Sequence, residues 1–155
     1  MKHKSIRTLA ALPALTIAFF NLPIRAQAAS STEQTLLRLL NEDRARSGLP
    51  ALILDEELSR IARIKSQDMV NNNYFAHTSP TYGNVRSMLN SFGVKYLSAG
   101  ENIARSRSVY HSNAAFLSSE GHRRNMLSST FTHVGIGIVV NAHGFVTVTE
   151  IFVRR

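Results

Sequence analysis

The hydrophobic pattern of this 155-residue chain changes its period near residue 134, and this change constrains the fold more than any other feature. Upstream, apolar residues recur at the three- and four-residue spacing of helices. Downstream, they alternate along two short runs, 134–140 and 145–153. The segment 141–144, Asn-Ala-His-Gly, suits a hairpin turn between the runs. Helices followed by a late antiparallel hairpin predict an α+β domain in which helices pack on a small sheet.

Helical spacing is confined to four segments, and capping residues mark several of their ends. Ser31 and Gln34 are spaced as a capping box at the start of the first segment, and Asp55 is placed to cap the second. Gly48 and Gly93 follow the first and third segments, where glycine commonly ends a helix. The predicted helices are 31–47, 55–70, 84–92 and 108–117.

The first 28 residues have the pattern of a secretory signal peptide. Basic residues open the segment, an apolar run covers 8–24, and Ala26-Gln27-Ala28 is the small-x-small sequence that a signal peptidase cleaves. Two prolines and Asn21 interrupt the run, which is shorter than the roughly 20 apolar residues of a spanning helix. Cleavage near Ala28 is therefore predicted in preference to a membrane anchor. The mature protein is expected to be secreted or periplasmic, with no transmembrane segment.

Residues 29–155 are predicted to form a single domain, because no repeat, low-complexity tract or long linker divides them. Removing 28 of the 155 residues leaves 127, which is enough to bury one core. The chain has no cysteine. An exported domain of this kind has to be stabilised by packing alone or by a bound metal, since disulfides are absent.

The net charge of +8 overstates how basic the mature domain would be. Four of the 18 Lys and Arg lie in the first 28 residues and all ten Asp and Glu lie after them, which leaves +4. Nucleic-acid binding would need a clustered basic stripe and a reading motif, and the sequence has neither. The charge indicates only a mild attraction to anionic cell-wall polymer or lipid headgroups.

Two histidines of the domain have unusual neighbours. His77 lies in Phe-Ala-His-Thr-Ser-Pro, directly after a predicted helix, and His122 follows a glycine. Glu101, next to Asn102, lies between them in the sequence, and Glu120 comes two residues before His122. Two imidazoles and one or two carboxylates, in three loops or helix ends, form a ligand set that zinc accepts, often with an open coordination position.

Each of these residues also has an ordinary structural explanation. A single histidine is more often a hydrogen-bonded structural residue than a ligand, and Glu101-Asn102 can tie loops together through backbone amides. Ser79 and Ser119 lie near the histidines, but neither has the sequence of a nucleophile elbow. A serine hydrolase is therefore not predicted.

Six segments resemble the bacterial form of the CAP superfamily (cysteine-rich secretory, antigen 5 and pathogenesis-related proteins), also called the SCP domain. Each segment alone is modest, but in this order and at compatible spacing they are specific, and the likeness covers about 35–153. They are LNEDRARSGLPAL (40–52), LDEELSRIARIKSQDM (54–69), YFAHTSP (74–80), AGENIA (99–104), FLSSEGHRRNMLSSTFTHVGIGI (116–138) and VTEIF (148–152). The resemblance implies an α-β-α sandwich with a small antiparallel sheet between helical layers and a central cleft.

The resemblance also implies a cleft in which two histidines and two glutamates can hold zinc or another divalent metal. His77, Glu101 and His122 match three of these positions, and the fourth falls on Ser119, one residue before Glu120. A shift of one residue turns a helical side chain by roughly 100°, so Glu120 is a candidate ligand only if the local backbone bends. The residues expected to support the cleft are Ser79, Asn102 and Ser119.

Three functions from different classes remain open. The preferred one is an exported binding module whose His/Glu cleft engages lipid, sterol or cell-envelope polymer. The second is a zinc-dependent hydrolase or peptidase with Glu101 as general base. The third is a structural envelope protein with an unoccupied cleft. The incomplete acidic set favours binding over catalysis, and no catalytic residue is assigned. Glu150, where bacterial relatives usually have Gln, is a further departure from the family pattern.

Overall fold

The computed structural model describes residues 29–155, and the predicted signal peptide (1–28) lies outside them. Five helices and four strands that form one mixed sheet make up this part of the chain, which confirms the predicted α+β class. The elements are α1 (Ser31–Arg46), β1 (Ile53–Leu54), α2 (Glu56–Asn71), α3 (Val85–Ser91), β2 (Ser98–Ser106), α4 (Val109–Ser118), α5 (Glu120–Met126), β3 (His133–Val140) and β4 (Val146–Arg154).

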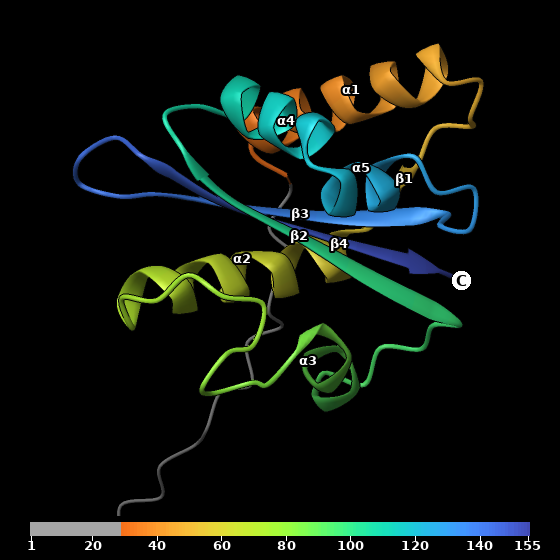
Figure 1. The fold of residues 1–155 in the computed structure, drawn as a ribbon. Coiled ribbons are helices and arrows are strands. Elements are labelled where there is room, and N and C mark those ends of the chain that lie inside the picture. The colour runs from red at the N-terminus through yellow and green to blue at the C-terminus, as the bar shows by residue number, and fades with distance from the viewer. Residues whose placement is uncertain (1–28) are drawn as a thin grey trace, which may run out of the picture.

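The four strands form one sheet in the order β1-β3-β4-β2 (Figure 1). β4 pairs antiparallel with both β3 and β2, whereas the short β1 pairs parallel with β3. The sheet is therefore mixed, whereas an antiparallel sheet was predicted. β1 and β3 are parallel because a long crossover that begins with α2 returns the chain in the same direction. The register places Glu101 opposite Ile151 and Asn102 opposite Glu150, in the middle of the edge strand β2.

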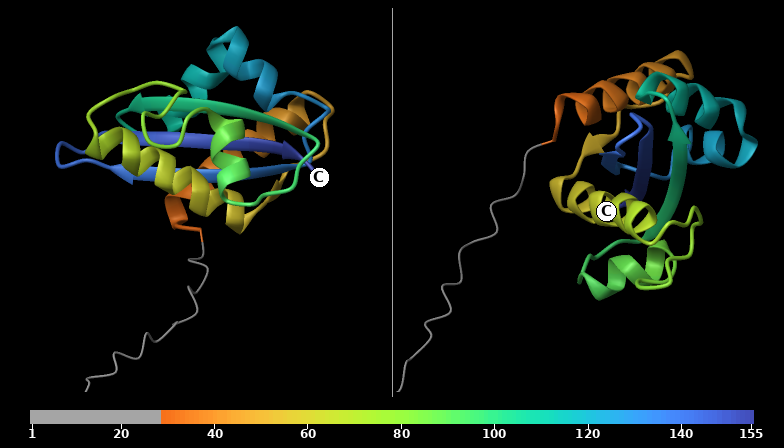
Figure 2. Two further views of the ribbon diagram at one scale, coloured as in Figure 1. Left: turned by 90° about the horizontal axis from the view of Figure 1, so that it is seen from below. Right: turned by 90° about the vertical axis from the view of Figure 1, so that its left-hand side faces the viewer.

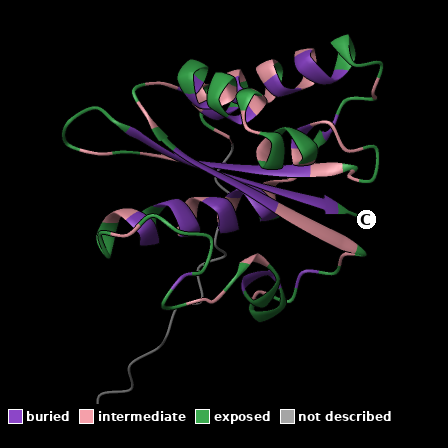
Figure 3. Cartoon of the chain, viewed as in Figure 1, coloured by how far each residue is buried: buried purple, intermediate pink, exposed green. Residues whose placement is uncertain are grey.

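Helices cover both faces of the sheet. α1, α4 and α5 lie on one face and α2 and α3 on the other (Figures 1 and 2). Because side chains alternate along a strand, the sheet contributes to two cores: Val134 and Phe152 to the first, Ile151 and Val153 to the second. β4 is buried along all but its last residue, and β3 is buried in its middle (Figure 3). The predicted α-β-α sandwich is confirmed.

Two glycines let α2 contact β3 directly. A Cβ atom on Gly135 would lie 2.2 Å from the backbone carbon of Leu58, and one on Gly137 would lie 2.1 Å from that of Ala62. No side chain fits in this space, so close approach of helix and strand requires glycine at both positions. The contact sets the height of α2 above the sheet, and with it the position of the loop that follows α2.

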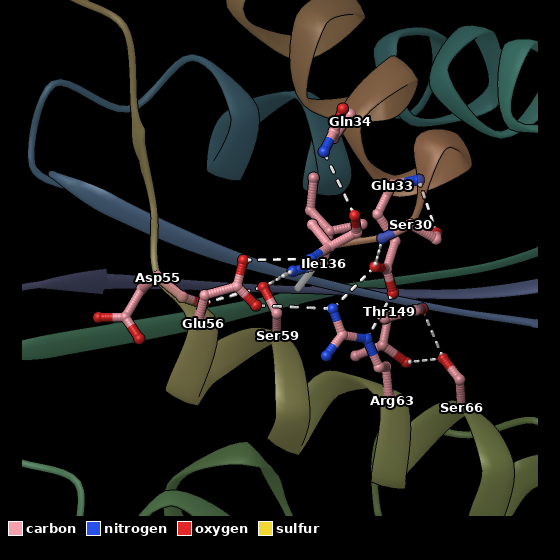
Figure 4. A network of polar contacts seen from close by, with 12 residues as sticks. Ser30, Glu33, Gln34, Asp55, Glu56, Ser59, Arg63, Ser66, Ile136 and Thr149 are labelled. Carbon is pink, nitrogen blue, oxygen red and sulfur yellow. Dashed lines mark hydrogen bonds and ion pairs between the residues drawn. The ribbon is translucent and has the colours of Figure 1, made fainter. Parts of the chain in front are cut away.

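A polar network joins α1 and α2 next to the sheet (Figure 4). The capping box of α1 consists of Ser30 and Glu33, so the predicted pair, Ser31 and Gln34, was wrong by one residue. Glu33 is better suited because its buried carboxylate also binds Arg63 of α2, with N–O distances of 2.7 and 2.8 Å. One carboxylate therefore caps one helix and attaches it to another.

Two elements, β2 and α5, were not predicted from the sequence, and both contribute to the candidate site. β2 is an edge strand with Gly100, Glu101 and Asn102 near its centre, and Met126 is the buried residue of the short α5. Glu101 and Asn102 thus lie in a strand, where adjacent side chains face opposite sides of the sheet.

Candidate functional site

A buried lysine fixes the loop that carries His77. The Lys65 ammonium group donates hydrogen bonds to the carbonyl oxygens of Ala76, at 2.9 Å, and of His77, at 3.0 Å. It also lies 5.0 Å from the centre of the Tyr74 ring. Lys65 is almost fully buried, and a buried ammonium requires such partners. The backbone at His77 is therefore held in place from the helix beneath it.

Asp68 orders the rest of this loop. Its carboxylate accepts hydrogen bonds from the hydroxyl groups of Tyr74, Ser79 and Thr81 and from the amide of Asn72. Burial acts to raise the pKa of Asp68, but these hydrogen bonds together bring it below its ordinary value. Ser79 thus contacts Asp68 and supports the loop that follows His77.

His77, Glu101 and His122 come together beside the edge strand. His77 Nδ1 lies 2.8 Å from Glu101 Oε1, and the ring centres of the two histidines are 6.4 Å apart. Glu101 is buried, whereas 56% of the His77 side chain is exposed. The ring of Phe116 packs against His122 at 5.2 Å between centres. The site therefore pairs an exposed imidazole, held by a buried carboxylate, with a partly buried one.

The surroundings move the pKa values of the two imidazoles in opposite directions. The hydrogen bond with Glu101 raises the pKa of His77, and the charge of Glu101 adds to this, while burial and the charge of Lys65 oppose it. Burial lowers the pKa of His122, and the charge of His77 lowers it further. His77 therefore binds a proton first, and His122 stays neutral beside it.

On the other face of β2, Asn102 connects the strand to α5. Its amide nitrogen donates to Glu150 Oε2 at 3.1 Å and to the carbonyl oxygen of His122 at 3.2 Å, and its oxygen accepts from Asn125 at 2.9 Å. Asn125 can approach β2 because Gly100 has no side chain. A Cβ atom at this position would lie only 2.9 Å from Asn125 Oδ1. Asn102 thereby holds the backbone of His122 against the edge strand.

Glu150 is buried beneath this contact. Within residues 29–155, its Oε2 binds Asn102 and its Oε1 has no hydrogen-bond partner. Burial raises the pKa of Glu150 to about 8, against the smaller opposing effect of the Asn102 hydrogen bond. The side chain is therefore mostly uncharged at neutral pH and resembles the glutamine that the family pattern has at this position.

Glu120 and Ser119 are not brought to the histidines. The Glu120 carboxylate pairs with Arg124 at 2.8 Å, and 80% of its side chain is exposed. Ser119 joins α4 to α5, and its hydroxyl group makes no capping hydrogen bond. In residues 29–155, no group of three or more His, Cys, Asp or Glu side chains is arranged to hold a metal ion. The donors present do not fit a four-ligand zinc site.

Two pockets lie away from the histidines. One of about 420 Å³ is lined by Lys95, Tyr96, Leu97 and Arg155, and one of about 180 Å³ lies beside Asp68. The predicted central cleft at the histidines stays a prediction.

Lys65 and Asn125 contribute to the site but were not predicted from the sequence. Lys65 had a signal, because it falls four residues after Ile61 and four before Met69, on the buried stripe of α2. A lysine on such a stripe needs buried acceptors. No sequence signal identified Asn125, because its role depends on the contact between α5 and β2, and β2 was not predicted.

Known proteins similar to this chain show the family to which it belongs. The model of the family described as "CAP: Cysteine-rich secretory protein family" matches residues 37–153. The chain belongs to the CAP family. The uncharacterized protein YkwD of Bacillus subtilis (strain 168) is 48% identical to this CAP chain over 111 residues, 71% of the chain and 43% of YkwD. The uncharacterized membrane protein YlbC of the same organism is 38% identical over 113 residues, 70% of the chain and 32% of YlbC. The CAP chain thus spans less than half the length of either relative.

Solved structures agree with the CAP fold. An extracellular SCP-domain protein from Bacillus anthracis has a TM-score of 0.74 at 36% identity, covering 80% of this chain and 40% of that one. An outer surface protein of Borrelia burgdorferi has a TM-score of 0.73 at 16% identity, covering 79% and 91%, and shows the fold alone. Among residues 29–155 of the CAP chain, no helix has the length and apolar character needed to cross a membrane.

Proposed function

We propose that this CAP protein is an extracellular binding module in which His77, Glu101 and His122 hold a polar component of the cell envelope. The observation that carries the proposal is the exposed ring of His77, fixed by buried Glu101 and lying beside His122. Lys65 and Asp68 hold the loop before any ligand arrives. Groups fixed in advance lose little conformational entropy on binding, which favours recognition.

Cell-wall polymer suits this site better than lipid or sterol. The groups at the site are imidazoles, a carboxylate and backbone carbonyls, whereas an acyl chain or a sterol ring needs an apolar lining. Protonated His77 attracts phosphate or carboxylate groups, and neutral His122 can donate or accept a hydrogen bond with a hydroxyl group. Wall polymers present all of these groups to water.

Cosedimentation with purified, insoluble walls of Bacillus subtilis, the source of two relatives, tests the proposal. We expect the double variant His77→Gln/His122→Gln to bind at least about tenfold more weakly than the parent chain, since each hydrogen bond with a charged group contributes roughly 1.5–3 kcal/mol. The matched control is His111→Gln/His143→Gln, which changes two exposed histidines elsewhere. Equal binding by the double variant and the control would contradict the proposal.

A zinc-dependent hydrolase is the second candidate, and it is favoured by the contact of His77 with Glu101 and by the closeness of the two imidazoles to each other. Because Glu120 pairs with Arg124 instead, we expect zinc affinity far below that of a four-ligand site. Equilibrium dialysis of the purified chain against zinc measures this affinity. Tight binding of one zinc per chain, lost in His77→Gln/His122→Gln, would favour the hydrolase over the binding module.

A further inference from the structure

A second surface lies at the end of the sheet where β3 turns into β4. The register aligns three strand ends there, because Ser106 of β2 and Val140 of β3 both pair with Val146 of β4. We name this surface the hairpin end and define it as residues 105–110 and 139–146 with Phe75. We propose that the hairpin end docks on the surface of an anionic lipid bilayer. The proposal uses residues other than the histidine site and does not depend on the function proposed for that site.

Exposed apolar side chains gather at the hairpin end. Of six large hydrophobic residues that are exposed within residues 29–155, four lie there, and the hairpin is among the exposed parts of the chain (Figure 3). These four are Phe75, Tyr110, Val140 and Phe145. The other two, Ile53 and Leu97, lie at the opposite end of the strands, beside the start of β3 and the start of β2. Clustering of this kind marks an interaction surface, whereas scattered exposed residues do not.

The same surface is cationic. Arg105 lies 5.3 Å from the centre of the Phe75 ring and donates a hydrogen bond to the carbonyl oxygen of Tyr74 at 3.0 Å, which joins the loop to the strand end. Arg107 follows two residues later and is exposed. The segments 70–76, 105–111 and 139–147 contain no Asp or Glu. Asp68, near Tyr74, is buried and occupied by hydrogen bonds.

A bilayer can bind both the arginines and the exposed apolar side chains of the hairpin end, whereas a hydrated polyanion can bind only the arginines. Arginines bind lipid phosphates, and each cation near an anionic membrane strengthens binding about fivefold. Phe145 and Val140 gain only if they enter a layer with apolar character, as the boundary between headgroups and acyl chains provides. Docking is therefore expected to be peripheral and reversible, with the sheet end directed at the membrane.

Vesicle cosedimentation of residues 29–155 tests the inference. This fragment contains every element of the two cores and excludes the apolar run 8–24, which would bind lipid by itself; circular dichroism and a cooperative melt establish its folding first. We expect binding to phosphatidylcholine vesicles that also contain the anionic lipid phosphatidylglycerol, and this binding should weaken as salt rises. We expect little binding to vesicles of pure phosphatidylcholine.

Two variants separate the contributions of charge and apolar contact. Arg105→Gln/Arg107→Gln should weaken binding roughly 20- to 30-fold, as two factors of about five. Val140→Ser/Phe145→Ser should weaken it about tenfold, through lost apolar contact. The control variants, Arg86→Gln/Lys95→Gln and Ile53→Ser/Leu97→Ser, make matched changes away from the hairpin end and should bind as the parent does.

The outcomes decide the inference in either direction. Loss of binding in both hairpin-end variants, with both controls unchanged, supports docking on a bilayer. No binding to anionic vesicles, or equal binding by variants and controls, overturns it. Loss in the arginine variant alone, with soluble polyphosphate competing fully, would identify a polyanion site and overturn the assignment to lipid.

Discussion

Each face of the sheet buries one glutamate, Glu101 of β2 and Glu150 of the neighbouring β4, and the two carboxyl groups have different partners. Glu101 faces the loop after α2, where it contacts His77 and lies within the electrostatic reach of Lys65. Glu150 lies on the opposite face, where it contacts the neutral Asn102, and burial raises its pKa to about 8. One glutamate therefore orients an imidazole on its face of the sheet, whereas the glutamate on the other face is mostly uncharged at neutral pH.

The two faces also pack differently. On the α2 face, β3 contributes glycines, and helix backbone rests directly on strand backbone. On the other face, β3 contributes Val134 and Ile136 to a core of interlocking side chains with α1 and α4. A backbone contact cannot adjust by rotamer changes, whereas a side-chain core can repack. The α2 face is therefore the rigid one, and it is the face that carries the His77 loop.

The largest expected effect comes from disturbing this backbone contact. In Gly137→Ala, the new methyl group would collide with the backbone of Ala62 and Arg63 at 2.1 Å, so α2 has to move. We expect a loss of at least about 3 kcal/mol in the free energy of unfolding, measured by urea denaturation. Gly121→Ala is the control, because nothing lies within 4 Å of that position and alanine suits a helix. A Gly137→Ala variant as stable as the control would show that the faces do not differ in rigidity.

The helices and the hairpin were predictable because their burial is periodic. α1, α2 and the pair β3 and β4 each show regular apolar spacing, and their bounds agree with the prediction within a few residues. β2 escaped prediction because Ser98-Ala99-Gly100-Glu101-Asn102 places polar and small residues where an apolar alternation would be expected. α5 escaped for a similar reason, since EGHRRNM has no apolar stripe.

The site was predictable as residue types but not as geometry. His77, Glu101 and His122 were predicted as candidate site residues from their sequence segments. The direction of the Glu120 side chain, however, depends on where α4 ends and α5 begins. Its carboxylate lies one turn from Arg124 on the same helix, and this local pair prevails over a distant ligand role. Glu150 was noticed as a departure from the family pattern, but its burial became clear only once β4 was placed at the centre of the sheet.

Glu150→Gln sharpens the comparison by removing the uncharged carboxyl group. The folded-state pKa of about 8 lies above the ordinary value of 4.5, so the folded chain binds more protons between these values. Wild-type stability from this group is then complete below pH 4.5 and falls as pH rises to about 8. Glutamine does not titrate, so the variant should gain stability relative to wild type as pH rises above 4.5, by on the order of 3 kcal/mol at pH 7.

Urea unfolding of both chains across pH 4–9 gives this difference directly, and effects of other titrating groups cancel in the comparison. Glu120→Gln serves as the control, because it makes the same substitution at an exposed carboxylate. A constant gap between Glu150→Gln and wild type would mean that Glu150 is charged in the folded state at neutral pH.

The smallest expected effect lies on the other face, in the titration of the histidines. The hydrogen bond with Glu101 raises the pKa of His77 above 6.5, and burial with the charge of His77 lowers that of His122 below 6.5. In Glu101→Gln, the pKa of His77 should therefore fall, and that of His122 should rise because its neighbour is less often charged. Since 56% of the His77 side chain is exposed, solvent limits the loss of stability to about 1 kcal/mol or less.

Two-dimensional NMR of the imidazole nitrogens resolves both titrations in one series. The sign of the linkage is fixed: the His77 contribution is complete below pH 6.5 and is lost as pH rises through its raised pKa, whereas His122 costs stability as pH falls below 6.5. Glu120→Gln should leave both titrations unchanged, because its carboxylate pairs with Arg124. If His122 gained its proton before His77, Glu101 would not be the group that orients the site, and the contrast with Glu150 would lose its basis.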